Sequence, residues 1–115
     1  MEGRMNKNVV PLESEIESAV VKYAKNSGWR VFKLNLMGNR GWPDRLFIRN
    51  GPLFLFIEFK RPGIKPTKLQ DFRLDQLRAM GVVAIWSSSK EECYEFLDTA
   101  AETPVGPTPV PGEGD

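Results

Sequence analysis

Two apolar runs separated by a turn dominate the middle of the sequence. Residues 44–49 (DRLFIR) and 53–60 (LFLFIEFK) flank the tripeptide NGP, which predicts a β-hairpin. The second run is apolar on both faces, so we expect it to lie in the centre of a sheet. The hairpin nevertheless carries Asp44, Glu58 and Lys60 near one end. Burying a lone charge is costly, so these groups must be paired, protonated or coordinated to a metal ion.

The flanking segments predict the remaining elements. Apolar residues at helical spacing over 12–27 predict a helix, and alternation over 29–36 predicts a half-buried strand. Thr67 can cap a helix over 68–80, an apolar strand follows at 82–87, and Ser88 or Ser89 can cap a last helix over 90–101. The residues expected to pack from the last two helices are Leu69, Phe72, Leu77, Met80, Cys93, Phe96 and Leu97. The predicted order is αβββαβα.

Length and composition fit one α/β domain. We expect a flexible N-terminus over 1–10, a folded domain over 11–102, and a disordered tail rich in Pro and Gly over 103–115. No apolar stretch is long enough for a membrane span and no signal peptide is evident, so we expect a cytoplasmic protein without a membrane partner. The single cysteine and the absence of histidine exclude an internal disulfide, a multi-cysteine zinc site and a histidine base.

Charge is distributed unevenly along the chain. Residues 1–81 contain 15 Lys and Arg against 8 Asp and Glu, a balance of +7, whereas residues 82–115 have a balance of −6. The basic part favours a polyanionic partner such as nucleic acid. An ordinary solvated surface followed by an acidic tail explains the charge equally well.

The hairpin geometry suggests a metal site. Glu58 and Lys60 share one face of their strand, and a tight turn over 49–52 places Asp44 opposite about residue 57. Two neighbouring carboxylates repel one another unless a cation lies between them, and oxygen ligands suit Mg²⁺ or Mn²⁺. The alternative is that Lys60 forms a simple salt bridge with Glu58 or Asp44.

At these residues the sequence resembles the PD-(D/E)XK nuclease superfamily, with PD at 43–44 and EFK at 58–60. The longer pattern GWPDRLFI…FIEFKRPGIKPTKLQ, with Gly41 and Gln70 in register, resembles the VRR-NUC branch. The resemblance covers about residues 12–98. It implies a restriction-endonuclease-like α/β fold with an αβββαβ core, in which helices flank a mixed central sheet. It also implies metal-dependent hydrolysis of phosphodiester bonds.

The resemblance also implies roles for individual residues. Asp44, Glu58 and the backbone carbonyl of Phe59 would bind the metal ion, and Lys60 would position the attacking water. Gln70 matches the glutamine of the helix after the motif. An acid on the first helix completes the set, as a ligand either directly or through a water.

That acid must be chosen among Glu13, Glu15 and Glu17. Glu13 lies within the apolar face of the helix, Glu17 lies at its edge, and Glu15 lies on the opposite side. We therefore choose Glu13 and keep Glu17 in reserve. Any of the three could instead be an ordinary acid that interacts with the helix dipole.

Basic and aromatic residues beside the motifs could contact DNA. Each cation is individually also explained as a solvated surface charge, and Trp42 could either stack on a base or fill its loop against the sheet. Trp29 and Trp86 fit strand patterns and are expected in the core. The candidate DNA-binding residues are Arg40, Trp42, Arg45, Arg61, Lys65 and Lys68.

Three functional hypotheses follow. The first is a small endonuclease that recognises DNA shape, because small stand-alone members of the family resemble resolvases of four-way (Holliday) junctions. Two symmetric cuts need two active sites, which a homodimer would supply. The second is a non-catalytic DNA-binding domain with a nuclease-like fold. The third is an unrelated α/β protein whose hairpin charges form salt bridges.

Overall fold

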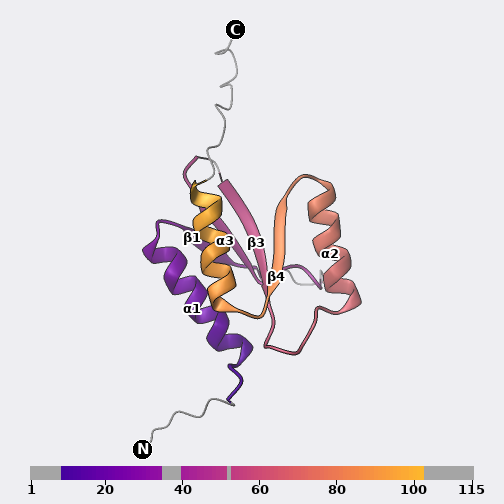
Figure 1. Cartoon of the computed structure of the whole chain (residues 1–115). Helices are drawn as coiled ribbons and strands as arrows, with labels where there is room; N and C mark the ends of the chain where they lie inside the picture. Colours follow the sequence, from indigo (N-terminus) through magenta and orange to yellow (C-terminus); the bar gives the residue numbers. More distant parts are fainter. Residues whose placement is uncertain (1–8, 35–39, 52, 103–115) are drawn as a thin grey trace, which may run out of the picture.

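A computed structural model describes residues 9–34, 40–51 and 53–102 of the chain. Its elements follow in the order α1 (Glu13–Asn26), β1 (Arg30–Lys33), β2 (Arg45–Arg49), β3 (Leu53–Phe59), α2 (Lys68–Ala79), β4 (Val83–Ser87) and α3 (Lys90–Glu102), as Figure 1 shows. This confirms the predicted order αβββαβα. The predictions for residues 1–8, for 35–36 of the first strand and for the tail at 103–115 lie outside the described residues.

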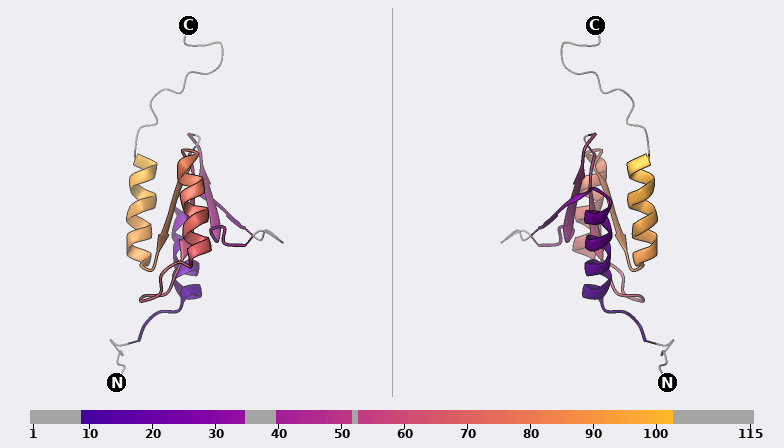
Figure 2. Two further views of the ribbon diagram at one scale, coloured as in Figure 1. Left: turned by 90° about the vertical axis from the view of Figure 1, so that its right-hand side faces the viewer. Right: turned by 90° about the vertical axis from the view of Figure 1, so that its left-hand side faces the viewer.

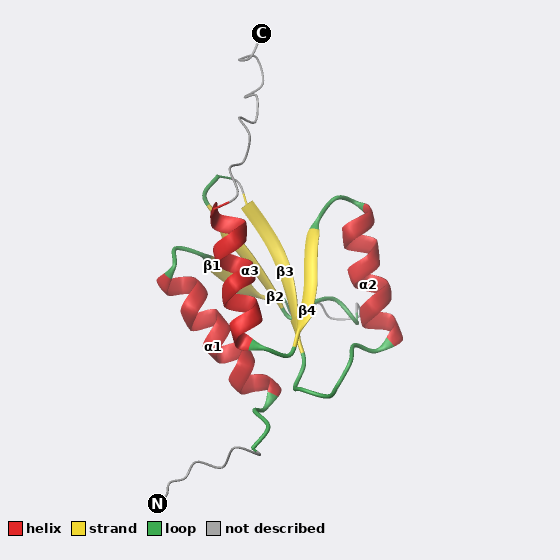
Figure 3. Ribbon diagram, viewed as in Figure 1, coloured by secondary structure: helices red, strands yellow, loops and turns green. Residues whose placement is uncertain are grey.

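The four strands form one mixed sheet in the order β1-β2-β3-β4 (Figure 3). β1 pairs with β2 and β2 with β3 in antiparallel fashion, whereas β3 and β4 are parallel. β3 therefore lies between two partners, as its apolar sequence predicted. The parallel connection from β3 to β4 runs through α2, as a crossover requires.

Alternation of side chains along the strands gives the sheet two different faces. On one face Phe47, Leu55 and Ile57 pack against α1 and α3, which lie side by side in Figure 1. Figure 2 shows the sheet from the side, with α3 as a separate layer. On the other face α2 packs a smaller cluster against Ala84 of β4. Trp29 is buried in the first cluster, and Trp86 packs at the margin of the second.

The prediction for the packing face of α2 was largely wrong. Leu69, Phe72 and Met80 are exposed, and the buried residues are Leu74 and Leu77. At 100° per residue, Leu74 and Leu77 lie within about 60° of one another, whereas Phe72 lies on another side of the helix. The physical reason is that α2 packs mainly against β4, so a narrow apolar stripe is enough to cover that part of the sheet.

Polar side chains fix where the last two helices begin. The backbone N–H of Gln70 donates to Thr67 Oγ1 over 3.1 Å, and that of Glu92 donates to Ser89 Oγ over 3.1 Å. The prediction of Thr67 as a cap is confirmed, and of the two serines predicted as alternatives Ser89 is the cap. None of the helices in the described ranges is both long and apolar enough to cross a membrane.

Candidate active site

Strand pairing brings Asp44 and Glu58 together. Arg45 pairs with Ile57 across β2 and β3, so the residue before β2 lies opposite Glu58, one position from the prediction. Two backbone bonds extend the pairing beyond the assigned strands: the Leu34 N–H donates to the Asp44 carbonyl, and the Lys60 N–H donates to the Ser87 carbonyl, both over 3.0 Å. The carboxylates are therefore held by the sheet and not by a flexible loop.

Glu58 is a buried acid with one oxygen unused. Only 2% of the residue is exposed, and its Oε2 accepts a hydrogen bond from Gln70 Nε2 over 2.9 Å. The ammonium of Lys60 lies 3.7 Å from the same oxygen. Oε1 is buried and has no hydrogen-bond partner among the described residues. Burial raises the pKa of Glu58 to about 8; the charge of Asp44 adds to this rise, and that of Lys60 opposes it.

The ionised form of Asp44 is also disfavoured by its surroundings. Its Oδ2 accepts a hydrogen bond from the backbone N–H of Phe59 over 2.9 Å, which favours the charged form. Burial nevertheless outweighs that bond and raises the pKa of Asp44 above its ordinary value, with a further rise caused by Glu17. Both carboxylates would therefore be stabilised by added positive charge between them.

Gln70 is oriented by the cap of its own helix. Its Oε1 accepts the backbone N–H of Thr67 over 2.9 Å, while Thr67 Oγ1 accepts the backbone N–H of Gln70. With Oε1 occupied in this way, Nε2 is free to donate to Glu58. The capping box thus fixes which end of the carboxamide faces the acid.

Among the acids of α1, Glu13 interacts electrostatically with both carboxylates, whereas Glu17 interacts with Asp44. The pKa of Glu13 is raised by burial first and then by Asp44, while Lys60 lowers it. Glu17 instead accepts a 2.6 Å bond from Arg45 Nε. Glu15 caps its own helix by accepting the Leu12 backbone N–H over 2.8 Å. Glu13 therefore remains the candidate acid of the first helix.

α2 also anchors the loop that leads to Asp44. Gly41 has φ +85°, and a Cβ atom at this position would lie 2.6 Å from Leu69 Cγ, so only glycine fits. The guanidinium of Arg73 lies 4.6 Å from the ring centroid of Trp42, and its Nε donates to the Arg40 carbonyl over 3.2 Å. Neither Leu69 nor Arg73 was predicted from the sequence to support this loop, although Arg73 follows Gln70 by about one helical turn.

The candidate DNA-binding residues fall into three groups. Trp42 is half-buried and packs against the second core cluster, which supports loop filling, one of its two predicted roles. Arg45 is partly buried and engaged by Glu17. The remaining candidates are exposed on the loops and the α2 N-terminus that border the carboxylates: Arg40, Arg61, Lys65 and Lys68.

The donor set fits a hard divalent cation. Asp44, Glu58 and the Phe59 carbonyl would supply oxygen ligands, and the unpartnered Oε1 of Glu58 is a buried acceptor that lacks a positive partner. Within the described ranges no three Asp, Glu, Cys or His side chains are grouped closely enough to hold an ion. An ion at this site would therefore need backbone, water or substrate oxygens in addition to the two carboxylates.

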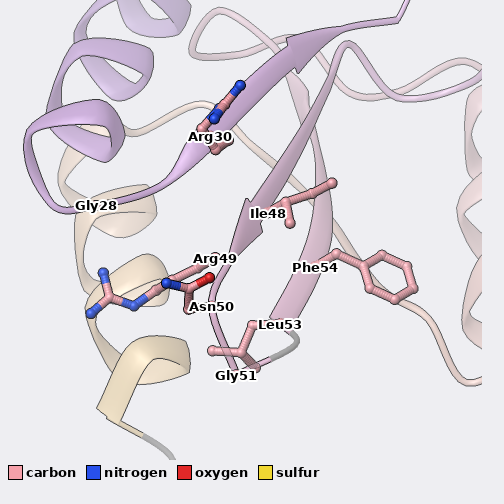
Figure 4. Close-up of a pocket in the computed structure, with 8 residues that line it drawn as sticks. All are labelled: Gly28, Arg30, Ile48, Arg49, Asn50, Gly51, Leu53 and Phe54. Atoms are coloured by element: carbon pink, nitrogen blue, oxygen red, sulfur yellow. The ribbon is translucent and has the colours of Figure 1, made fainter.

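The far end of the sheet has a different character. A recess of about 470 Å³ lies there, and Figure 4 shows its residues, with Ile48 and Phe54 projecting from neighbouring strands. Its charged lining comes from Arg30 and Arg49, and it contains no acidic side chain. The recess is therefore not an extension of the carboxylate site.

An αβββαβ core with Asp44, Glu58 and Lys60 at one end of its hairpin is the arrangement that the resemblance to PD-(D/E)XK nucleases led us to expect. The chain is 34% identical over 79 residues to a protein named "Putative nuclease p44" from Acyrthosiphon pisum secondary endosymbiont phage 1, covering 69% of this chain and 85% of the relative. A solved structure described as a VRR_NUC domain has the same fold, with a TM-score of 0.70 over 75% of this chain and 94% of that chain, at 23% identity. No family model matches the sequence.

The chain therefore belongs to the same nuclease family as this phage relative, and its fold is that of a VRR_NUC domain. This result confirms the resemblance inferred from PD at 43–44 and EFK at 58–60, together with the predicted fold class. It also excludes the hypothesis of an unrelated α/β protein with incidental salt bridges.

Proposed function

We propose that the protein is a deoxyribonuclease that depends on Mg²⁺ or Mn²⁺ and cuts branched DNA as a homodimer. The observation that carries the catalytic part is Glu58, which is almost fully buried beside Asp44 with its Oε1 unpartnered among the described residues. A protein that used these groups only for stability would not benefit from two mutually repelling acids, one of them buried and the other partly buried.

In this proposal Asp44, Glu58 and the Phe59 carbonyl hold the ion, with Glu13 contributing directly or through a water. The ion would lower the pKa of a bound water and neutralise charge on the phosphoryl group. Lys60 orients the attacking water by donating hydrogen bonds, since its ammonium lies 3.7 Å from Glu58 Oε2. Gln70 holds the Glu58 carboxylate in one orientation through its 2.9 Å bond.

The exposed cations around the site would contact the DNA backbone. Arg40, Arg61, Lys65 and Lys68 lie on segments next to the carboxylates, which suits binding of phosphates on both sides of the cut. A small domain of this size offers little surface for reading sequence, so we propose recognition of shape and specifically of a four-way junction. Two subunits would supply the two cuts that resolution of such a junction requires.

The test is cleavage of labelled four-way junction, flap, linear duplex and single-stranded DNA with Mg²⁺, Mn²⁺ or EDTA. We expect metal-dependent cuts, fastest on the junction, and a dimer by sedimentation at micromolar concentration. Cleavage that persists in EDTA would contradict the metal dependence. A monomer that cuts junction and linear duplex equally would contradict the assembly and the substrate, while metal-dependent nuclease activity would stand.

The competing hypothesis is a non-catalytic DNA-binding domain with the same fold. Thermal unfolding with and without Mn²⁺ helps to separate the two. A nuclease should gain thermal stability from Mn²⁺, because the ion relieves repulsion between Asp44 and Glu58. A protein that binds junction DNA but neither gains stability from Mn²⁺ nor cuts any substrate would support the non-catalytic hypothesis.

A further inference from the structure

A group of cations lies on the sheet face opposite Glu58. Lys33 of β1 pairs directly with Arg45 of β2, so both side chains project from the same face, next to α1. Like charges directly opposite one another on a sheet are destabilising. Arg45 offsets part of this cost through its 2.6 Å ion pair with Glu17, but among the described residues Lys33 has no acidic partner.

α1 adds two more cations to the same region. Lys22 and Lys25 line, together with Arg45, a surface recess of about 370 Å³. Neither lysine forms an ion pair within the part of the chain that the structure describes. We call the four residues Lys22, Lys25, Lys33 and Arg45 the α1 cationic surface. It carries four positive charges against the single negative charge of Glu17.

We propose that the α1 cationic surface binds the phosphodiester backbone of the DNA substrate beyond the site of cleavage. The inference rests on the proposed function, which makes DNA the substrate. None of the three lysines belongs to the group around the carboxylates, so this surface would be a second contact region. Lys33, which faces Arg45 across two strands, and Lys22 and Lys25, which are unpaired among the described residues, would be stabilised by a polyanion that they share.

The position of the surface relative to the carboxylates fits a continuous strand of DNA. Arg45 directly follows Asp44, and Glu17, its partner, is close enough to Asp44 to raise the pKa of that acid. The surface therefore begins beside the candidate active site. From Glu13 to Lys25 the axis of α1 rises by about 18 Å, a length that corresponds to about five base-pair steps along the axis of a DNA duplex.

The experiment measures binding without cleavage. Fluorescence anisotropy in EDTA would give the dissociation constant for a labelled four-way junction and a labelled linear duplex at several NaCl concentrations. The variants are Lys25→Gln and the triple variant Lys22→Gln/Lys25→Gln/Lys33→Gln. The matched control is Lys90→Gln, which also removes one exposed lysine at a helix surface, but from α3.

Each lost phosphate contact should lower the slope of log affinity against log salt by about 0.9 in magnitude. We expect a change of about 0.9 for Lys25→Gln, of about 2 to 3 for the triple variant, and none for Lys90→Gln. The triple variant should bind at least about tenfold more weakly at 0.1 M salt. Its cleavage rate at saturating DNA should stay within about twofold of wild type, because no group at the carboxylates has changed.

Two results would overturn the proposal. One is a triple variant with the same salt slope and affinity as wild type. The other is a triple variant that aggregates while its soluble fraction binds normally, which would assign Lys33 the role of protecting an edge strand. Failure of the proposed function is distinguishable from both, because a wild-type protein that cuts no DNA with Mg²⁺ or Mn²⁺ can still show the expected loss of salt slope.

Discussion

The two ends of β3 invert the usual relation between polarity and burial. At the end nearer α2's first turn, Glu58 and Lys60 are 2% and 9% exposed. At the other end Phe54 is 49% exposed, and Ile48, its partner on β2, is 37% exposed. The same central strand therefore buries charge at one end and exposes aromatic surface at the other.

The difference shows which end is under functional constraint. An apolar side chain at the surface costs little, because much of any protein surface is apolar. A buried carboxylate costs several kcal/mol unless it is compensated, and the repulsion between Glu58 and Asp44 adds to that cost. The end that carries the larger energetic cost is the end where chemistry is expected.

The largest effect should come from removing a carboxylate. Asp44→Asn should reduce cleavage at least about 10³-fold, because it removes a proposed ligand of the ion and keeps the shape of the side chain. Rates measured on a labelled junction with Mg²⁺ test this. Asp75→Asn is the matched control, since Asp75 is an exposed acid on α2. Near-normal Mg²⁺-dependent activity of Asp44→Asn would rule out the site.

Lys60→Ala should lower the cleavage rate by about 10²-fold while metal binding persists, because Lys60 is assigned to the water and not to the ion. The stabilisation of each variant by Mn²⁺ in thermal unfolding gives the second readout. If Lys60→Ala lost the response to Mn²⁺ as completely as a carboxylate variant, the division of roles would be wrong.

One glycine before β2 and one after it allow the two ends of this strand to be compared directly. Gly41 and Gly51 both have positive φ, but only Gly41 would place a Cβ atom against another side chain. Gly51→Ala should cost about 1 kcal/mol of stability and leave cleavage unchanged. Gly41→Ala should cost more and reduce cleavage by about 10²-fold, because it displaces the loop before Asp44. Equal activity of the two variants would mean that α2 does not position that acid.

Stability should depend on pH through Glu58. Its pKa is about 8 in the folded protein against 4.5 as a model value, so between these values the unfolded chain releases a proton that the folded chain retains. The free energy of unfolding should therefore fall as pH rises from about 4.5 to about 8 in EDTA. Glu58→Gln should remove this loss and be more stable above pH 8, by at most about 5 kcal/mol. The measurement is the free energy of unfolding in urea of wild type and Glu58→Gln across this pH range. The same pH dependence in both proteins would contradict the prediction.

The smallest effect is expected at the opposite end of β3. Phe54→Ser should lower stability by about 1 kcal/mol at most, because the ring is half-exposed and its main aromatic neighbour is Phe56 at 6.4 Å. Cleavage per folded molecule should not change. A large loss of rate, with the fold intact by circular dichroism, would show that this end of the sheet also contributes to function.

The sequence predicted the fold well for identifiable reasons. Strand and helix periodicity in the segments around Phe47 and Val20 reflects burial on one face, which local pattern records directly. The turn predicted from NGP gave the hairpin register, and with it the pairing of Asp44 with Glu58, to within one residue of the observed pairing. Thr67 and Gln70 follow a capping pattern that is local in sequence.

Other features depend on contacts between distant segments. The buried side of α2 is set by the part of the sheet that it covers. Leu74 is therefore buried, whereas Phe72, which was expected to pack, is exposed. The close approach of Gly41 to Leu69 and the stacking of Arg73 on Trp42 join residues separated by about 30 positions, and no local pattern reports them. The ion pair of Glu17 with Arg45, which distinguishes Glu17 from Glu13, also joins segments that are distant in the sequence.

The sequence by itself determined the element order, the central position of β3 and the acids available for chemistry, because these follow from periodicity, turn residues and composition. Only the tertiary structure decided that Glu58 has a buried oxygen without a partner among the described residues, that Gln70 Nε2 faces that acid, and that Asp44 adds to the rise in its pKa. Burial and Coulomb interactions depend on distance through space, and separation along the chain does not specify that distance.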